Sequence, residues 1–291
     1  MNQIFLNRIK EYLGSDEYEK FVASYSLEVK KAIIWNNKKK QNLKYLLQDG
    51  KQEILEDKEK KNIQVDIILQ NREEYILNDK EINGKNYLHH AGVIYISEPS
   101  AASVVEKIDI KSSDKVLDLC ASPGGKSIQA LNYLKEEDGG FLIANEIVVK
   151  RVKILSSNIE RMGYKNVIIL SETPKKISEN FEGYFDKVIV DAPCSGEGLF
   201  RRDENAIKEW SLENVKACAL RQKEILDEAY KCVKEGGKLL YSTCTFSKEE
   251  DEEVTEYFVT KHNDFKLIYE EKILPHMNNG EGQYIAVFER K

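Results

Sequence analysis

From residue 115 onward the chain alternates apolar runs with amphipathic stretches, and this alternation constrains the fold more than any other feature. Apolar runs that we expect to be strands cover residues 115–120, 141–146, 166–170, 185–193 and 238–245, and we expect helices at 124–134, 149–162 and 211–233. Near-continuous apolar strands that alternate with helices are typical of a parallel sheet covered on both faces. The sequence therefore predicts an α/β fold with a doubly wound sheet.

The two ends of the chain show other patterns. After residue 245 we expect an acidic helix over 248–260 and two strands at 265–269 and 284–289, which are close enough in sequence to pair antiparallel at the sheet edge. In the first 100 residues we expect two short helices within 4–25, with Ser15 capping the second, a helix over 39–48, and strands at 32–36, 65–69 and 92–97. We therefore expect a small α/β accessory domain over 1–100 and a larger domain over 101–291.

Composition excludes several protein classes. The 291 residues are 41% hydrophobic and 32% charged, and no apolar run approaches the roughly 20 residues that span a bilayer. The first 20 residues contain acids where a secretory signal would be apolar, so we expect a cytoplasmic protein. The five cysteines form no CxxC pair, which argues against a disulfide framework and a zinc site. We expect a monomer, because a chain of this length can bury its own core.

The net charge of -6 is unevenly distributed. Residues 247–271 contain nine acids and three lysines, which accounts for the whole imbalance, and we expect this stretch to face away from any nucleic acid. Residues 30–48 contain six lysines and no acid, so one face there could attract phosphate. The candidate phosphate contacts are Lys38, Lys39 and Lys40. From charge alone, an ordinary solvated lysine-rich surface is an equally good interpretation.

Ligands of such a sheet bind beyond the carboxyl ends of its strands. The loop at 120–126, CASPGGK, connects a strand to a helix, and its two glycines allow a ligand to approach the backbone closely. It has the spacing of neither a P-loop nor GxGxxG. Glu146 ends the next strand, where a carboxylate can accept two ribose hydroxyls. Alone, the glycine pair could be a structural turn and Glu146 a solvated residue or helix cap.

Two further loops each place a cysteine just past a strand end. DAPCSG at 191–196 contains Cys194, and STCT at 242–245 contains Cys244. If the two strands are neighbours they lie about 4.8 Å apart, and the two thiols could face one cleft with Asp191 beside them. A thiolate that adds to a ring carbon is one way to activate a pyrimidine. The other three cysteines are expected to be small buried side chains.

Several stretches resemble one known family, the Nol/Nop/Sun RNA cytosine-5 methyltransferases. They are LDLCASPGGK, ANEI, VDAPCSGEGLFRRD, KEWSLENV, LRQKEIL, YSTCTF and GEGQYIAVF, and together they extend over most of the chain. HHAGVIYISEPSA and DAPCSGEGLFRRD look most like the bacterial small-subunit ribosomal RNA methyltransferase F branch. The resemblance implies a Rossmann-like class I methyltransferase fold, with a mostly parallel seven-stranded sheet, that uses S-adenosylmethionine. Members of that branch commonly continue into a further RNA-binding region, which we expect this chain to lack.

The resemblance also implies a role for each matching residue. Cys244 would attack C6 of a cytosine, Cys194 would assist release of the covalent adduct, and Asp191 would hold the polar edge of the ring beside the cofactor. A flipped or unpaired base would be the target, because it must enter the cleft. The residues implied to bind the cofactor are Cys120, Ala121, Ser122, Pro123, Gly124, Gly125, Lys126, Glu146, Thr173 and Asp191.

This sequence departs from the family pattern at two places. Thr173, preceded by Glu172, stands where the family usually has an aspartate beside the adenine, and residues 34–37 read IWNN where an Arg-x-Asn-Thr run is usual. The substrate implied is RNA, with ribosomal RNA favoured over transfer RNA. A non-catalytic RNA-binding assembly factor with the same fold is the competing hypothesis, and the presence of both cysteines argues against it. A nicotinamide-dependent oxidoreductase is not favoured, because GxGxxG is absent.

Overall fold

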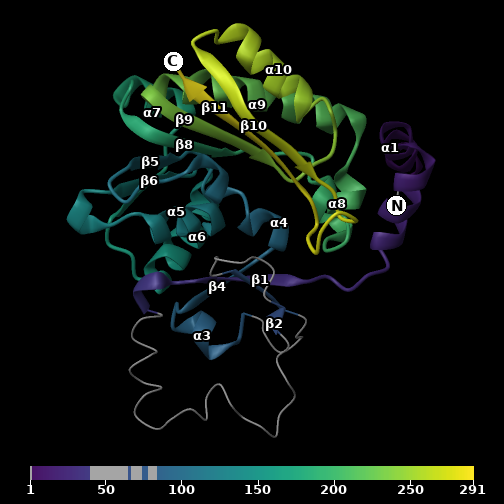
Figure 1. Cartoon of the computed structure of the whole chain (residues 1–291), viewed down its shortest axis with the longest axis horizontal. Helices are drawn as coiled ribbons and strands as arrows, with labels where there is room; N and C mark the ends of the chain where they lie inside the picture. Colours follow the sequence, from purple (N-terminus) through teal and green to yellow (C-terminus); the bar gives the residue numbers. More distant parts are fainter. Residues whose placement is uncertain (1, 40–64, 67–73, 78–83) are drawn as a thin grey trace, which may run out of the picture.

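The computed structural model describes residues 2–39, 65–66, 74–77 and 84–291, and it contains two sheets (Figure 1). The larger has the strand order β10-β11-β9-β8-β5-β6-β7, in which β11 runs opposite to the other six strands. Its strands are β5 (Lys115–Asp118), β6 (Phe141–Asn145), β7 (Val167–Leu170), β8 (Phe185–Asp191), β9 (Val233–Thr243), β10 (Phe265–Ile273) and β11 (Gln283–Arg290). The predicted seven-stranded, mostly parallel sheet is confirmed.

Helices cover both faces of this sheet (Figure 1). On one face, α5 (Gly125–Tyr133) and α6 (Val149–Met162) bury Ile128 and Leu155 in one apolar cluster. On the other face, α9 (Leu212–Cys232) and α10 (Glu252–Lys261) bury Leu226 and Phe258 in a second cluster. Shorter helical elements among the described residues are α3 (Tyr87–His90), α4 (Pro99–Ala102), α7 (Pro174–Asn180), α8 (Glu204–Glu209) and 3-10 turns at Val105–Ile108, Glu136–Asp138 and Glu197–Leu199.

The smaller sheet has four antiparallel strands in the order β2-β3-β1-β4. They are β2 (Val65–Asp66), β3 (Glu74–Leu77), β1 (Lys31–Trp35) and β4 (Ile94–Ser97). Buried Asn36, from the unusual IWNN run, joins this sheet to the larger part of the chain. Its side-chain amide donates to the carbonyls of Gly92 (3.1 Å) and Met162 (2.6 Å). The asparagine that the family pattern keeps therefore has a structural role here.

The first helix, α1 (Gln3–Ser24), breaks at Gly14, whose φ of +75° is not helical. This break agrees with the two short helices expected over 4–25. Phe5 and Phe21 of α1 pack with Phe200, Trp210 and Phe246 in a third apolar cluster. The N-terminal helix thus packs against residues that follow β8 and β9, whereas β1 and β4 build the smaller sheet; the division at residue 100 stays a prediction.

Two boundaries differ from expectation. The strand expected from residue 238 is longer, because α9 ends at Cys232 and β9 starts at once with Val233, which pairs with Phe185. Gly236 and Gly237 lie where this pairing shifts register. Helix α10 begins at Glu252 and not at 248, because residues 247–251 form a turn. The helix expected at 39–48 lies outside the described residues except for its first residue. Among the described segments, no helix is long and apolar enough to cross a membrane.

Candidate active site

The two loop cysteines meet at the carboxyl ends of adjacent strands. β8 and β9 pair in parallel, with Asp191 opposite Ser242, so the loops that follow leave the sheet side by side. The Sγ atoms of Cys194 and Cys244 lie 3.0 Å apart, and both side chains are partly buried free thiols. The structure therefore brings together the two sulfur atoms that the sequence placed 50 residues apart.

The environment of Cys194 raises its pKa. The contact with Cys244 and, after it, burial raise the pKa of Cys194 well above its ordinary value. Cys194 therefore keeps its proton at neutral pH and can donate it in a hydrogen bond to the sulfur of Cys244.

Asp191, the last residue of β8, connects the cysteine loops to the glycine loop. Its Oδ2 atom lies 2.7 Å from Nζ of Lys126, and its Oδ1 atom accepts a hydrogen bond from the Ser242 hydroxyl at 2.9 Å. Lys126 is buried, whereas 34% of the Asp191 side chain is exposed. The carboxylate is thus held from behind by two partners and presents an edge to the cleft.

The loop at 120–126 lies between β5 and α5, as predicted. Gly124 caps α5 with a φ of +115°, a conformation that side chains rarely adopt, and a Cβ atom there would lie 3.3 Å from Leu155. Burial raises the pKa of the Cys120 thiol, so this third cysteine is an unreactive neighbour. The loop borders a cavity of about 260 Å³ whose wall includes Lys126, Asp191 and, from the N-terminal segment, Tyr95 and Glu98.

A second cavity, of about 560 Å³, adjoins the first at Cys120. Buried Glu146 lies in its wall, where the carboxylate accepts a hydrogen bond from the Val148 amide at 2.9 Å and lies 3.3 Å from Arg151. Ile147 and Val148 expose 55% and 45% of their surface beside it. A carboxylate for ribose hydroxyls next to exposed apolar side chains suits a nucleoside.

Thr173 also lines this second cavity, but its side chain caps helix α7 by accepting a hydrogen bond from the Lys176 amide at 3.2 Å. Glu172 forms an ion pair with the Lys176 side chain at 2.7 Å. The Thr173 hydroxyl can still donate a hydrogen bond, and Thr173 and Pro174 are part of the cavity wall. The role of Thr173 in cofactor binding therefore stays a prediction.

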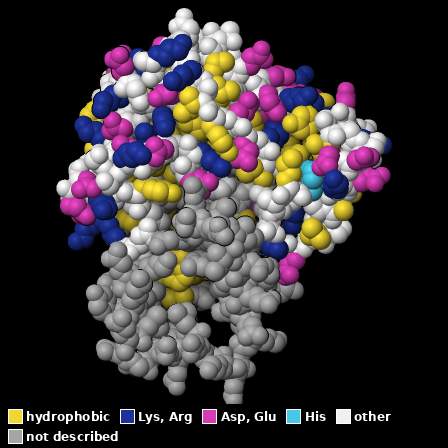
Figure 2. All heavy atoms as spheres, viewed as in Figure 1, with side chains coloured by type: hydrophobic (Ala, Val, Ile, Leu, Met, Phe, Trp, Pro, Cys, Tyr) yellow, Lys and Arg dark blue, Asp and Glu magenta, His cyan; other side chains and the backbone are white. Residues whose placement is uncertain are grey.

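Two of the three candidate phosphate contacts, Lys38 and Lys39, have partners within the chain. Lys38 forms an ion pair with Glu136 at 2.9 Å, and both side chains are nearly half exposed. Lys39 donates to the carbonyls of Ala91 (2.7 Å) and Arg161 (3.0 Å). Lys40 lies outside the described residues. Over the face in Figure 2, basic and acidic side chains alternate, so the described part of this face shows no large patch of one sign.

Comparison with known proteins agrees with this geometry. Residues 105–289 match the model of the family described as 16S rRNA methyltransferase RsmB/F. The chain belongs to this family. The ribosomal RNA small subunit methyltransferases F of Vibrio cholerae and Shewanella piezotolerans are 40% and 37% identical over 182 and 193 residues. These matches cover 59% and 64% of the chain but only 36% and 40% of the relatives, so the chain spans well under two thirds of their length.

Solved structures show the same fold. The PH0851 protein superposes with a TM-score of 0.84 at 27% identity, covering 98% of this chain and 65% of the other. The NSun6 protein of Pyrococcus horikoshii, solved with SFG, has a TM-score of 0.79 at 17% identity and covers 99% and 98%. The RsmB/F family uses S-adenosylmethionine. The cavities at the glycine loop and at Glu146 offer the space and the polar groups that such a cofactor needs.

Sequence reasoning missed three groups around the cysteines. Arg202 lines the smaller cavity and is exposed, and its side chain makes no hydrogen bond or ion pair with the described residues, although its charge acts on Glu281. Glu197 and Glu250 are buried, and each joins the two cysteine loops from behind. Glu250 could not be singled out from the sequence, because it lies in a run of acids and such a run is ordinarily on a solvated surface. Arg202, in the RRD run after DAPCSG, gave no signal separate from its neighbour Arg201.

Proposed function

We propose that this chain transfers a methyl group from S-adenosylmethionine to C5 of a cytosine in RNA, through a covalent adduct between Cys244 and C6. The observation that carries the proposal is the pair of thiols 3.0 Å apart next to Asp191. C5 of cytosine is a poor nucleophile, and addition of a thiolate to C6 makes it electron-rich. Two thiols in contact with each other beside a carboxylate supply the groups that such a reaction needs.

Cys244 adds to C6 as a thiolate, and the electron pair of the C5–C6 double bond becomes available at C5. When bound, the cofactor supplies an electrophilic methyl group. Asp191 holds the N3 and amino edge of the ring and shares a proton with N3 as the ring accepts electron density. Held by Lys126 and Ser242, this carboxylate needs no rearrangement to do so.

Release requires a base for the C5 proton. Once the sulfur of Cys244 is bonded to carbon, the contact that is the principal cause of the raised pKa of Cys194 is weakened. Cys194 then gives its proton to solvent and, as a thiolate, takes the proton from C5, whose bonding electrons re-form the C5–C6 double bond and expel Cys244 as a thiolate. The step restores the starting hydrogen bond between the two sulfurs. Cys194 therefore acts in release and not in attack.

We propose small-subunit ribosomal RNA as the substrate, because the family model and the curated relatives carry that description. The target base must leave its stack to reach the cysteines, which favours unpaired RNA. At the cavity wall, Arg202 offers a guanidinium that makes no hydrogen bond or ion pair with the described residues, and we propose that it contacts a phosphate next to the target. Lys38, Lys39 and Lys40 remain candidates for weaker contacts. Transfer RNA is the second candidate substrate.

The deciding experiment incubates the chain with S-adenosylmethionine and small-subunit RNA, free and within the subunit, and maps protected cytosines by bisulfite sequencing. Cys244→Ala should abolish both methylation and any adduct, whereas Cys194→Ala should accumulate an RNA–protein adduct that resists denaturant. Cys218→Ala is the matched control, because Cys218 is a buried free thiol that lies on α9 and not in either cysteine loop. Methylation by Cys244→Ala at the normal rate would refute the mechanism. RNA binding without methylation or adduct in the wild type would favour the assembly-factor hypothesis.

A further inference from the structure

The residues that follow the two cysteines share one buried carboxylate. Oε2 of Glu250 accepts hydrogen bonds from the backbone amide of Ser195, at 2.9 Å, and from the side-chain amide of Gln222, at 2.8 Å. Thr245 donates to Oε1 at 3.4 Å, and its hydroxyl lies 2.8 Å from that of Ser195. Glu250 thus links the residue after Cys194 to the residue after Cys244.

Glu250 does not belong to the surface of the cleft. Its relative exposure is 0%, and it lines neither the cavity at the glycine loop nor the one at Glu146. Helix α9 reinforces it through Gln222, whose amide also donates to the carbonyl of Pro193 at 3.0 Å. A carboxylate placed in this way cannot touch a substrate, and its contacts all lie on the backbone and side chains that aim the two thiols.

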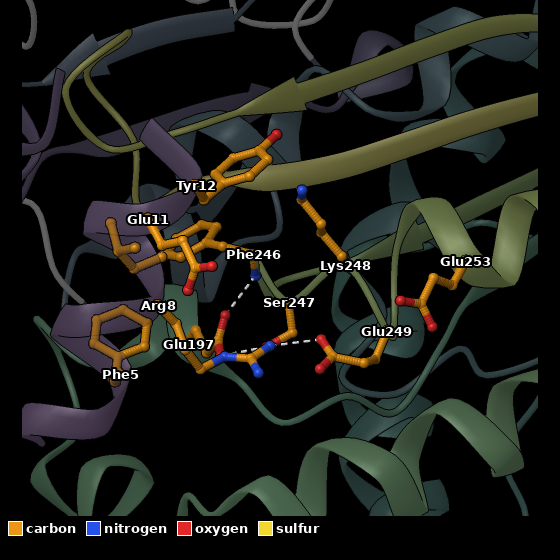
Figure 3. A pocket seen from close by; sticks show the side chains of 11 residues that line it. Phe5, Arg8, Glu11, Tyr12, Glu197, Phe246, Ser247, Lys248, Glu249 and Glu253 are labelled. Carbon is orange, nitrogen blue, oxygen red and sulfur yellow. Dashed lines mark hydrogen bonds and ion pairs between the residues drawn. The ribbon is translucent and has the colours of Figure 1, made fainter. Parts of the chain in front are cut away.

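Few other bonds hold the loops in register. Beyond the ends of β8 and β9, two backbone hydrogen bonds join them, from Ala192 to Ser242 and from Gly198 to Cys244. Glu197 adds a second carboxylate bridge farther along, accepting from the Phe246 amide at 2.8 Å and the Ser247 hydroxyl at 2.6 Å (Figure 3). Between these points, the side-chain links between the loops are Glu250 and the direct contact of the Ser195 and Thr245 hydroxyls, which Glu250 reinforces. A shift of either loop by 1 Å would alter the 3.0 Å contact by a third.

We propose that Glu250 is a positioning residue that fixes Cys194 and Cys244 at the separation that catalysis requires. The bridge itself is independent of the reaction, whereas its importance for turnover rests on the proposed function. Buried networks of hydrogen bonds are sensitive to the loss of one member. The bridge therefore contributes to the alignment of the sulfur atoms in addition to its contribution to stability.

Three variants separate the bridge from its charge. Glu250→Gln can keep all of the contacts, because the amide oxygen can accept from Ser195 and Gln222 while the amide nitrogen donates to Thr245. Glu250→Ala removes the bridge. Thr245→Val removes the link to the Cys244 loop with little change of shape. Glu256→Ala is the matched control, because Glu256 is an exposed glutamate in α10 whose side chain makes no hydrogen bond or ion pair to the described residues.

The separation of the thiols can be measured without RNA or cofactor. The full chain is equilibrated with reduced and oxidised glutathione; two protein thiols and one oxidised glutathione give one protein disulfide and two reduced glutathiones. The equilibrium constant reports the effective concentration of one thiol at the other. We expect Glu250→Ala and Thr245→Val to lower it by about tenfold or more, equivalent to about 30 mV, and Glu250→Gln and Glu256→Ala to change it by less than about threefold.

Methylation should follow the same order, with kcat reduced and the KM for S-adenosylmethionine unchanged in Glu250→Ala and Thr245→Val. If Glu250→Ala does not fold, Thr245→Val and Glu250→Gln still decide the question. The proposal is overturned if Thr245→Val leaves the thiol equilibrium unchanged, or if no variant, including wild type, forms the Cys194–Cys244 disulfide. A changed thiol equilibrium in a chain without methyltransferase activity would support the bridge and reject the proposed function.

Discussion

The two ends of the cleft are built differently. At the cofactor end, Glu146 contacts Val148 and Arg151, and the glycine loop runs directly from β5 into α5 and is bonded to α6, 29 to 35 residues away. At the cysteine end, Ser195 is bonded to Glu250 across 55 residues and Phe246 to Glu197 across 49. The cofactor end therefore depends more on backbone conformation and nearer segments, and the cysteine end on buried polar links between more distant segments. Variants at one end should leave the other end intact.

Asp191 is the exception, because it joins the ends through Lys126, and its loss should have the largest effect. Asp191→Asn keeps the size of the side chain but removes the charge that stabilises a proton on N3 as the ring accepts electron density, and we expect single-turnover methyl transfer to slow by about 10²–10⁴-fold. Ser242→Ala is the control, since it removes only the hydrogen bond to Oδ1 and should slow transfer by less than about tenfold. A rate within threefold of wild type for Asp191→Asn would exclude a role in proton transfer.

Glu250→Gln sharpens the comparison through the pH dependence of stability. Burial raises the pKa of Glu250 from 4.5 to about 7. The folded chain therefore holds a proton that the unfolded chain releases between these pH values, and the free energy of unfolding of the wild type falls as pH rises through this window. Glu250→Gln lacks this titration, so its stability relative to wild type should rise by up to about 3 kcal/mol between pH 4 and pH 8.

Urea unfolding at several pH values measures this difference, and Glu256→Gln, which replaces an exposed glutamate of α10, is the control. A flat difference for Glu250→Gln would show that the pKa of Glu250 is the same in the folded and the unfolded chain. In that case the hydrogen bonds from Ser195 and Gln222 would offset the effect of burial. The bridge itself would then be stronger than the buried environment suggests.

The same contrast explains what could be predicted from the sequence. The seven-stranded sheet, the glycine loop and the meeting of Cys194 with Cys244 follow from apolar runs and from the rule that parallel strands end at one edge. The bridging role of Glu250 does not follow, because nothing within the acidic run distinguishes a buried acid from a solvated one. Its burial is set by Gln222 and Ser195, which only the folded chain brings to it. Long-range polar links are invisible to local patterns.

Gly124→Ala tests the local character of the cofactor end. The φ of +115° at Gly124 disfavours any side chain, so the backbone of the loop must shift, and we expect S-adenosylmethionine to bind about tenfold more weakly by calorimetry. The control is Gly139→Ala, at a φ of +79° in a turn with no atom near the added Cβ, which should affect stability but not cofactor binding. The thiol equilibrium with glutathione should be unchanged in both variants. A large change there would show that the ends are coupled.

The smallest effects should come from Lys38, which lies at neither end. Its ion pair with Glu136 is exposed, so Lys38→Ala should change the free energy of unfolding by less than about 0.5 kcal/mol. For RNA binding, Arg202→Ala should lower the slope of log affinity against log salt concentration by about 1, because a phosphate contact is lost. Lys38→Ala should lower it by less, since its ammonium must first leave Glu136. Glu136→Gln removes that competition, so a steeper slope in this variant would identify Lys38 as a phosphate contact that the ion pair restrains.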